Sequence, residues 1–174
     1  MSFAAAERAD LCDTFLQVGP DAPTLNDGWD AYDLAAHLWV RENRTTARLL
    51  IMVDPRRTEE LLIRAAKQEN SFLRLISLLR QGPAGVSPFR IPGAERLANT
   101  AELFIHHEDL RRAGPDPLPP RGLNEAATKA LTSALRRMAR LMFRKAPFGV
   151  DLVIPGGETI SVKRNRKVGI HGEP

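Results

Sequence analysis

Glu102 and His106 are two potential metal ligands that lie four residues apart in the segment TAELFIHHEDLRRAG, residues 100–114. On a helix, residues at i and i+4 lie about 40° apart around the axis, so this carboxylate and this imidazole converge on one point. Glutamate oxygen and histidine nitrogen both bind zinc and similar divalent ions. His107 is rotated by about 100° from His106 and should point elsewhere. Such a pair also occurs on solvated helices, so the metal hypothesis needs a third ligand from another segment.

The candidate third ligand is His37, which lies in the apolar segment DLAAHL of a helix expected over residues 31–44. Asp30 can cap this helix, with Asp33 three residues later in a capping-box arrangement. A partly buried imidazole needs a hydrogen-bond partner. The simpler interpretation is a core histidine bonded to a backbone carbonyl or to Asp33, one turn back. The alternative is a metal ligand.

The surroundings of Glu102 and His106 favour the metal interpretation. Ala98, Ala101 and Ile105 lie near the same face of the expected helix, so the polar pair should point into its apolar side. Burying a carboxylate without partners is costly, and a metal ion would offset that cost.

The rest of the sequence predicts a mainly α protein. Apolar residues at helical spacing, together with capping and breaking residues, predict five helices. These helices are expected at residues 2–18, 31–44, 59–81 (capped by Thr58), 93–113 and 123–145 (capped by Asn124). Residues 45–53 are ambiguous between helix and strand. Long helices with short connections before residue 114 indicate an antiparallel four-helix bundle, which would form a first domain at residues 1–114.

The C-terminal part, residues 123–174, has a different character. After the stiff linker PDPLPP it combines the additional helix with two β-rich runs around a Gly-Gly turn, the pattern of a small β-hairpin. The run KVGIH is compatible with a third strand. From Arg136 onward there are nine Lys and Arg against three Asp and Glu, whereas the preceding residues have sixteen against eighteen. Nucleic-acid binding through this basic end is a minor alternative, because aromatic residues that would stack on bases are absent there. We expect no specific nucleic-acid partner.

The single cysteine, Cys12, cannot form an internal disulfide, which fits a reducing compartment. It lies in an expected helix, and we interpret it as a small packing residue rather than a nucleophile. The N-terminal stretch lacks a basic-then-apolar signal pattern, and the longest apolar runs are far too short to span a bilayer. We therefore expect a cytoplasmic protein with no membrane partner.

A tryptophan followed by DLAAHL and, downstream, E-x-x-x-H resembles the DinB/YfiT-like superfamily of metal-binding four-helix bundles. Within it, the sequence is most similar to the mycothiol-dependent maleylpyruvate isomerase type, and AELFIHHEDLRRA resembles a small actinobacterial branch of metal-binding proteins. The resemblance covers residues 3–113. It implies one divalent metal ion, usually zinc or nickel, with His37, Glu102 and His106 as its ligands. It also implies chemistry with a thiol cofactor such as mycothiol, either S-transfer to a small molecule or isomerisation through a thiol adduct.

The sequence departs from this family in two ways. Members of the branch usually continue beyond the hairpin into an apolar helix, whereas this sequence ends at Pro174, which suggests a truncated C-terminus. In addition, no residues match a binding site for the thiol cofactor.

Three protein ligands would leave a fourth position open to water or a thiol, whose pKa the metal lowers. We expect Asp33 and Asp109 to orient His37 and His106 through hydrogen bonds. Arg41, one turn after His37, either receives an anionic substrate or forms a surface salt bridge. The first functional hypothesis is therefore a metal-dependent thiol transferase or isomerase, with a small-molecule thiol and a substrate as partners and a homodimer as an option. The alternative is a metal-binding or sensing bundle without turnover.

Overall fold

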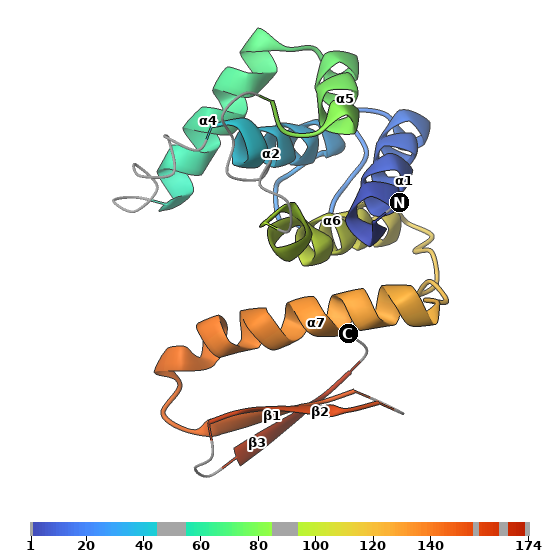
Figure 1. The fold of residues 1–174 in the computed structure, drawn as a ribbon. Helices are drawn as coiled ribbons and strands as arrows, with labels where there is room; N and C mark the ends of the chain where they lie inside the picture. The colour runs from blue at the N-terminus through green and yellow to red at the C-terminus, as the bar shows by residue number, and fades with distance from the viewer. Residues whose placement is uncertain (1, 45–54, 85–93, 155–156, 164–166, 173–174) are drawn as a thin grey trace. The chain divides into compact units, whose positions relative to one another are not determined.

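The computed structural model describes residues 2–44, 55–84, 94–154, 157–163 and 167–172, and it is mainly helical with a small β-sheet near the C-terminal end (Figure 1). The expected mainly α class is therefore confirmed. Contacts within the chain define two compact units, Met1–Arg121 and Gly122–Pro174. No helix in the described ranges has a stretch long and apolar enough to cross a membrane. The ambiguous residues 45–53 lie outside the described residues.

The described residues of the first unit form five helices around one apolar core. These helices are α1 (Phe3–Val18), α2 (Ala31–Asn43), α4 (Pro55–Glu69), α5 (Phe72–Gln81) and α6 (Ala94–Arg112) (Figure 1). The core includes Leu11 and Phe15 of α1, Leu38 of α2, Leu75 of α5 and Leu103 of α6. Since α1 packs against α5 and α6, and α2 packs against α4 and α5, helices α1 and α5 connect α6 to α2.

Side-chain caps define where the first two helices begin. The hydroxyl of Ser2 accepts a hydrogen bond from the backbone N–H of Ala5 at 3.2 Å and starts α1. At α2 the expected capping box is confirmed. The N–H of Asp33 donates to Asp30 Oδ1 at 2.7 Å, and the N–H of Asp30 donates to Asp33 Oδ2 at 3.3 Å. This reciprocal pair sets the start of the helix that carries His37.

The prediction of one long helix over residues 59–81 is wrong. The structure has two helices, α4 and α5, separated by Asn70 and Ser71. The side chain of Ser71 accepts a hydrogen bond from the backbone N–H of Arg74 at 3.3 Å and so begins a new helix. The hydroxyl of Tyr32 bonds to the carbonyl oxygen of Asn70, which satisfies a backbone group at the end of α4. A local cap and a tertiary contact therefore interrupt an otherwise continuous apolar stripe.

The start of α4 also differs from the prediction. Thr58 was expected to cap this helix, but α4 begins at Pro55, so Thr58 lies within it. Proline suits the first helical turn because its missing N–H would have no helical partner there. The longer helix places Glu59 inside α4 rather than at its first position.

Two charged side chains are buried between α1 and α2. Arg8 donates two hydrogen bonds to the carboxylate of Glu42, at 2.8 and 2.6 Å, and a third to the carbonyl oxygen of Leu79 at 3.0 Å. Nearby, the Cys12 thiol is buried, 3.9 Å from the carbonyl oxygen of Ile76, and burial raises its pKa to about 11. Cys12 is thus a packing residue, as expected from the sequence.

The second unit consists of a helix on a three-stranded sheet (Figure 1). Its elements are α7 (Glu125–Met142), the 3-10 helix η3 (Phe143–Lys145), β1 (Gly149–Val153), β2 (Thr159–Val162) and β3 (Lys167–His171). The predicted cap is confirmed, because the side chain of Asn124 accepts a hydrogen bond from the N–H of Ala127 at 2.9 Å. Strand β1 pairs antiparallel with β2, which confirms the hairpin, and parallel with β3, which confirms the third strand. Four arginines of this segment are exposed, namely Arg136, Arg137 and Arg140 of α7 and Arg144 of η3.

Replacing Glu42 by alanine should lower the free energy of unfolding by about 3–5 kcal/mol, because Arg8 would remain buried without its carboxylate. Urea denaturation followed by circular dichroism measures the change. Glu69→Ala is the matched control, since its ion pair with Arg44 is largely exposed and is worth at most about 1 kcal/mol. Equal losses in the two variants would contradict the buried-pair interpretation.

Candidate metal centre

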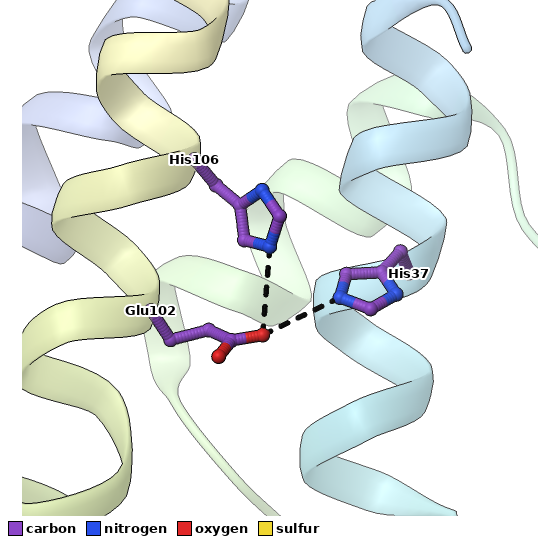
Figure 2. Close-up of side chains that lie close together, drawn as sticks. All are labelled: His37, Glu102 and His106. Carbon is purple, nitrogen blue, oxygen red and sulfur yellow. Dashed lines mark ion pairs between the residues drawn. The ribbon is translucent and has the colours of Figure 1, made fainter. Parts of the chain in front are cut away.

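The three predicted metal ligands meet between α2 and α6 (Figure 2). Nε2 of His37 lies 3.5 Å from Oε1 of Glu102, and Nε2 of His106 lies 3.4 Å from the same oxygen. One potential ligand atom from each residue lies within 4.8 Å of the others. Two helices that are separate in sequence therefore bring two imidazoles and a carboxylate to a spacing that could hold a metal ion.

The group lies at the margin of the apolar core rather than deep inside it. The side chain of Glu102 is 28% exposed and that of His106 is 13% exposed. Ile105, which was expected to share their apolar face, is 47% exposed, and the side chain of Ala98 lies outside the described residues. The buried face of α6 is formed instead by residues that include Leu103 and Leu110. The expectation that Glu102 and His106 share a buried apolar face with Ile105 is therefore wrong for Ile105, which is exposed.

The other nitrogen of each imidazole faces a carboxylate. Nδ1 of His106 lies 3.0 Å from Oδ2 of Asp109, as expected, and Nδ1 of His37 lies 2.8 Å from Oε1 of Glu59 in α4. Since a carboxylate only accepts hydrogen bonds, the network assigns a proton to each Nδ1. In the neutral imidazole, Nε2 then keeps its lone pair for a ligand. Metal-binding histidines typically have this arrangement.

The expectation that Asp33 orients His37 is wrong. Oδ1 of Asp33 accepts a hydrogen bond from Lys67 at 2.7 Å, and Oδ2 takes part in the capping box of α2. Its carboxylate is therefore engaged at the N-terminal end of the helix, and Glu59 holds the imidazole instead. Nothing in the spacing along the sequence relates Glu59 to His37, because the two residues meet only when α4 packs against α2.

Nε2 of His37 is buried and has no hydrogen-bond partner among the described residues. The nearest carboxylate oxygen, Oε1 of Glu102, is 3.5 Å away and pairs with it through charge rather than through a hydrogen bond. A buried polar atom without a partner is costly and requires an explanation. A cation between this nitrogen and the carboxylate would provide the missing partner.

Burial and charge act in opposite directions on the pKa values of the group. Burial lowers the pKa of His106, but Asp109 and Glu102 outweigh it and raise that pKa to about 9. Burial also lowers the pKa of His37, and the carboxylates of Glu102 and Glu59 outweigh it, so that pKa is raised as well. Burial alone would raise the pKa of Glu102, yet the two imidazoles hold it well below its usual range. Without a metal, the group is therefore held together by ion pairs.

Arg41 belongs to the same group. Its Nε atom forms an ion pair with Oε1 of Glu102 at 3.0 Å, and its NH1 group donates to Oδ1 of Asn99 at 2.6 Å. Its side chain is 14% exposed, so the pair with Glu102 is not a surface salt bridge. Arg41 thus directly contacts Glu102, one of the three candidate metal ligands.

His107 points away from the group, as helical geometry predicts. Its Nδ1 atom lies 2.7 Å from Oε1 of Glu7, and its Nε2 atom lies 2.9 Å from the hydroxyl of Thr14, both in α1. Arg121 also bonds to Glu7, at 2.7 Å. His107 therefore belongs to a separate buried polar network between α1 and α6.

A cavity of about 470 Å³ adjoins the candidate ligands. It is lined by His37, Val40, Arg41, Arg44, Glu59, Leu62, Ile63 and Glu102. Apolar side chains of α2 and α4 form part of its wall, and charged groups lie beside them. Small-molecule sites are typically cavities of about this size with an apolar wall and a few polar groups.

In the metal-free protein, the imidazole of His106 should titrate near pH 9, and Asp109→Asn should lower its pKa because an amide carries no charge. Nuclear magnetic resonance of the ring nitrogens across a pH series measures both values. Since the folded-state pKa exceeds the ordinary value of 6.5, this stabilisation is present below about pH 6.5 and is lost as the pH rises through about 9. A pKa near 6.5 in the folded protein would contradict the geometry.

Comparisons with known proteins give no relative from which a role could be transferred. The chain matches no protein-family model, no curated protein and no solved structure. The function has to be argued from the chemistry of the group formed by His37, Glu102, His106 and their neighbours.

Proposed function

We propose that this chain holds one divalent metal ion through His37, Glu102 and His106, and that it is a metal-dependent thiol transferase or isomerase. The observation that carries the proposal is the unpartnered Nε2 of His37, which is buried and directed at the same carboxylate oxygen as Nε2 of His106. Both rings are held at Nδ1 by a carboxylate, the arrangement found at metal-binding histidines. Zinc suits two imidazoles and one carboxylate, and nickel binds the same donors.

The charge of the group also suits a dication. Three carboxylates, those of Glu59, Glu102 and Asp109, lie against the two imidazoles, and Arg41 adds one positive charge. With both imidazoles protonated, the six groups are neutral as a set. Replacing the two protons by one divalent ion leaves that balance unchanged, so a metal can enter without leaving an uncompensated buried charge.

Within the part of the chain that the structure describes, only His37, Glu102 and His106 form a group that could hold a metal ion. The two further carboxylates of the group, Glu59 and Asp109, lie at Nδ1 of His37 and His106, whereas the candidate ligand atom of each ring is Nε2. This supports an open coordination position, which is typical of catalytic zinc sites, over the alternative of a closed, non-catalytic metal-binding or sensing bundle. A bound metal would supply acidity, by lowering the pKa of a thiol or water molecule that it coordinates.

The remaining residues would bind and orient the substrate. The cavity beside His37 and Glu102 presents Val40, Leu62 and Ile63 as an apolar wall, and Arg44 adds a positive charge. Such a wall would bury the carbon skeleton of a small molecule and exclude water from the reacting groups.

The identity of the thiol and the finer classification belong to the same proposal. The segment DLAAHL and the downstream E-x-x-x-H resemble DinB-like bundles that use mycothiol, so mycothiol is the first thiol to test. Packing of α1 on α5 and α6, and of α2 on α4 and α5, supports the DinB-like bundle. The single, buried Cys12 supports a reducing cytoplasmic setting.

Purified protein should contain about one divalent ion per chain, and His37→Ala should lose most of it, because one of three ligands is removed. Elemental analysis by mass spectrometry measures the content. His107→Ala is the matched control: it removes a buried histidine of the same unit that lies outside the group, and should keep the metal. Wild-type metal content in His37→Ala would remove His37 from the site.

Cobalt(II) substitution would reveal whether a thiol can reach the open position. Adding a low-molecular-weight thiol, mycothiol first, should produce a ligand-to-metal charge-transfer band, because sulfur coordination gives such a band with cobalt. The pH midpoint of the band should lie well below the free thiol pKa of about 8.5. A cobalt spectrum that no small thiol changes would favour the non-catalytic bundle instead.

A further inference from the structure

We propose that Arg41 is a positioning residue, which fixes the carboxylate of Glu102 between the two imidazoles and is itself held by a buried hydrogen-bond chain that ends at Arg8. The inference rests on the proposed function, because its consequence is the metal affinity of the site. It assigns a role to residues that lie outside the ligand set.

The chain of contacts runs through three helices without interruption. Nε of Arg41 forms an ion pair with Oε1 of Glu102 at 3.0 Å, and its NH1 group donates a hydrogen bond to Oδ1 of Asn99 at 2.6 Å. The amide nitrogen of Asn99 donates to Oε1 of Glu42 at 2.8 Å. Glu42 in turn accepts both hydrogen bonds from Arg8. Each group in the sequence Arg8, Glu42, Asn99, Arg41, Glu102 therefore fixes the next.

The inner part of this chain is rigid because it is buried. Asn99 is fully buried, and Glu42 and Arg8 are 2% and 5% exposed. Arg8 also donates to the carbonyl oxygen of Leu79, which ties the chain to α5. Buried polar groups that are hydrogen-bonded to one another have one favourable arrangement, so this end acts as a fixed support.

The carboxylate of Glu102, at the outer end of this chain of contacts, needs such a support. Glu102 has a flexible side chain that is 28% exposed, and both imidazole nitrogens lie 3.4 Å or more from its oxygen. In the absence of a metal, the 3.0 Å ion pair with Arg41 is the shortest polar contact that this carboxylate makes among the described residues. Holding the oxygen at the convergence point before the metal arrives reduces the entropy lost on binding.

The geometry calls for arginine rather than any cation. One planar guanidinium uses Nε for Glu102 and NH1 for Asn99, so the two contacts have a fixed mutual direction. A lysine carries the same charge on a single nitrogen at the end of a flexible chain and cannot reproduce this planar two-armed contact. The variant Arg41→Lys therefore keeps the positive charge but loses the fixed geometry of the two contacts.

The test measures cobalt(II) affinity and the visible d–d spectrum of the bound cobalt in full-length wild type and Arg41→Lys. We expect the variant to bind cobalt about 10-fold or more weakly, as is typical when a residue that orients a ligand is lost, and to show a changed d–d spectrum. The matched control is Arg121→Lys. Arg121 also contacts two side chains of the first unit, the carboxylates of Glu7 and Glu108, but lies outside the group, so this variant should keep the wild-type affinity and spectrum.

Asn99→Ala provides a second test if Arg41→Lys does not fold. It leaves Arg41 and Glu102 in place but removes the link between them and Glu42, and it should also weaken cobalt binding. Wild-type affinity and spectrum in Arg41→Lys, or in Asn99→Ala, would overturn the proposal, even if the thermal midpoint fell. Wild-type protein that binds no cobalt, or His37→Ala protein that binds it normally, would refute the proposed function itself.

Discussion

One carboxylate oxygen, Oε1 of Glu102, is the point on which the candidate site depends. Two imidazole nitrogens and one guanidinium approach it from two helices, at 3.0 to 3.5 Å. A partly buried carboxylate is stable only when positive charge surrounds it, and the residues that supply this charge must then be held in turn. Glu59 and Asp109 hold the imidazoles, and Asn99 holds the guanidinium. The polar residues around the site are thus arranged to compensate the negative charge of Glu102.

The need to pair buried charges also determines how α1 packs, although α1 carries no candidate ligand. Its adjacent residues Glu7 and Arg8 are both buried and are satisfied by different helices. Glu7 bonds to His107 of α6 and to Arg121, whereas Arg8 bonds to Glu42 of α2. A rotation or shift of α1 would break both sets, so the two ion pairs fix its register against α6 and α2 together. Apolar packing alone tolerates such shifts more readily. In this way α1 positions the two helices that bring the candidate ligands together.

The sequence was informative where a signal was local. The i, i+4 spacing of Glu102 and His106, the capping box at Asp30, and the strand patterns of the hairpin all depend on neighbours in the chain, and the structure agrees with each. It was less informative where a tertiary partner decides the outcome. The helix break at Ser71 depends on the Ser71 cap and on the contact of Tyr32 with Asn70, which together interrupt a continuous apolar stripe. Glu59, rather than the expected Asp33, contacts the imidazole of His37, because α4 packs against α2 and Lys67 pairs with Asp33. Spacing along one helix does not predict which carboxylate of another helix will contact a histidine on the first.

The two sides of the imidazoles differ in a way that bears on turnover. On the Nδ1 side, the carboxylates of Glu59 and Asp109 lie 2.8 and 3.0 Å from His37 and His106 and occupy the position that another ligand would take. On the Nε2 side, the buried nitrogen of His37 has no hydrogen-bond partner among the described residues, and the cavity begins beside it. A site that only stores a metal gains by surrounding the ion with protein ligands, because each adds affinity and excludes competitors. A site for chemistry needs space next to the ion and a support that keeps the ligands in place while a substrate enters. The cavity offers that space, and the buried chain from Arg8 to Arg41 offers that support, and on these two features we base the proposal of a reacting centre rather than a storage site.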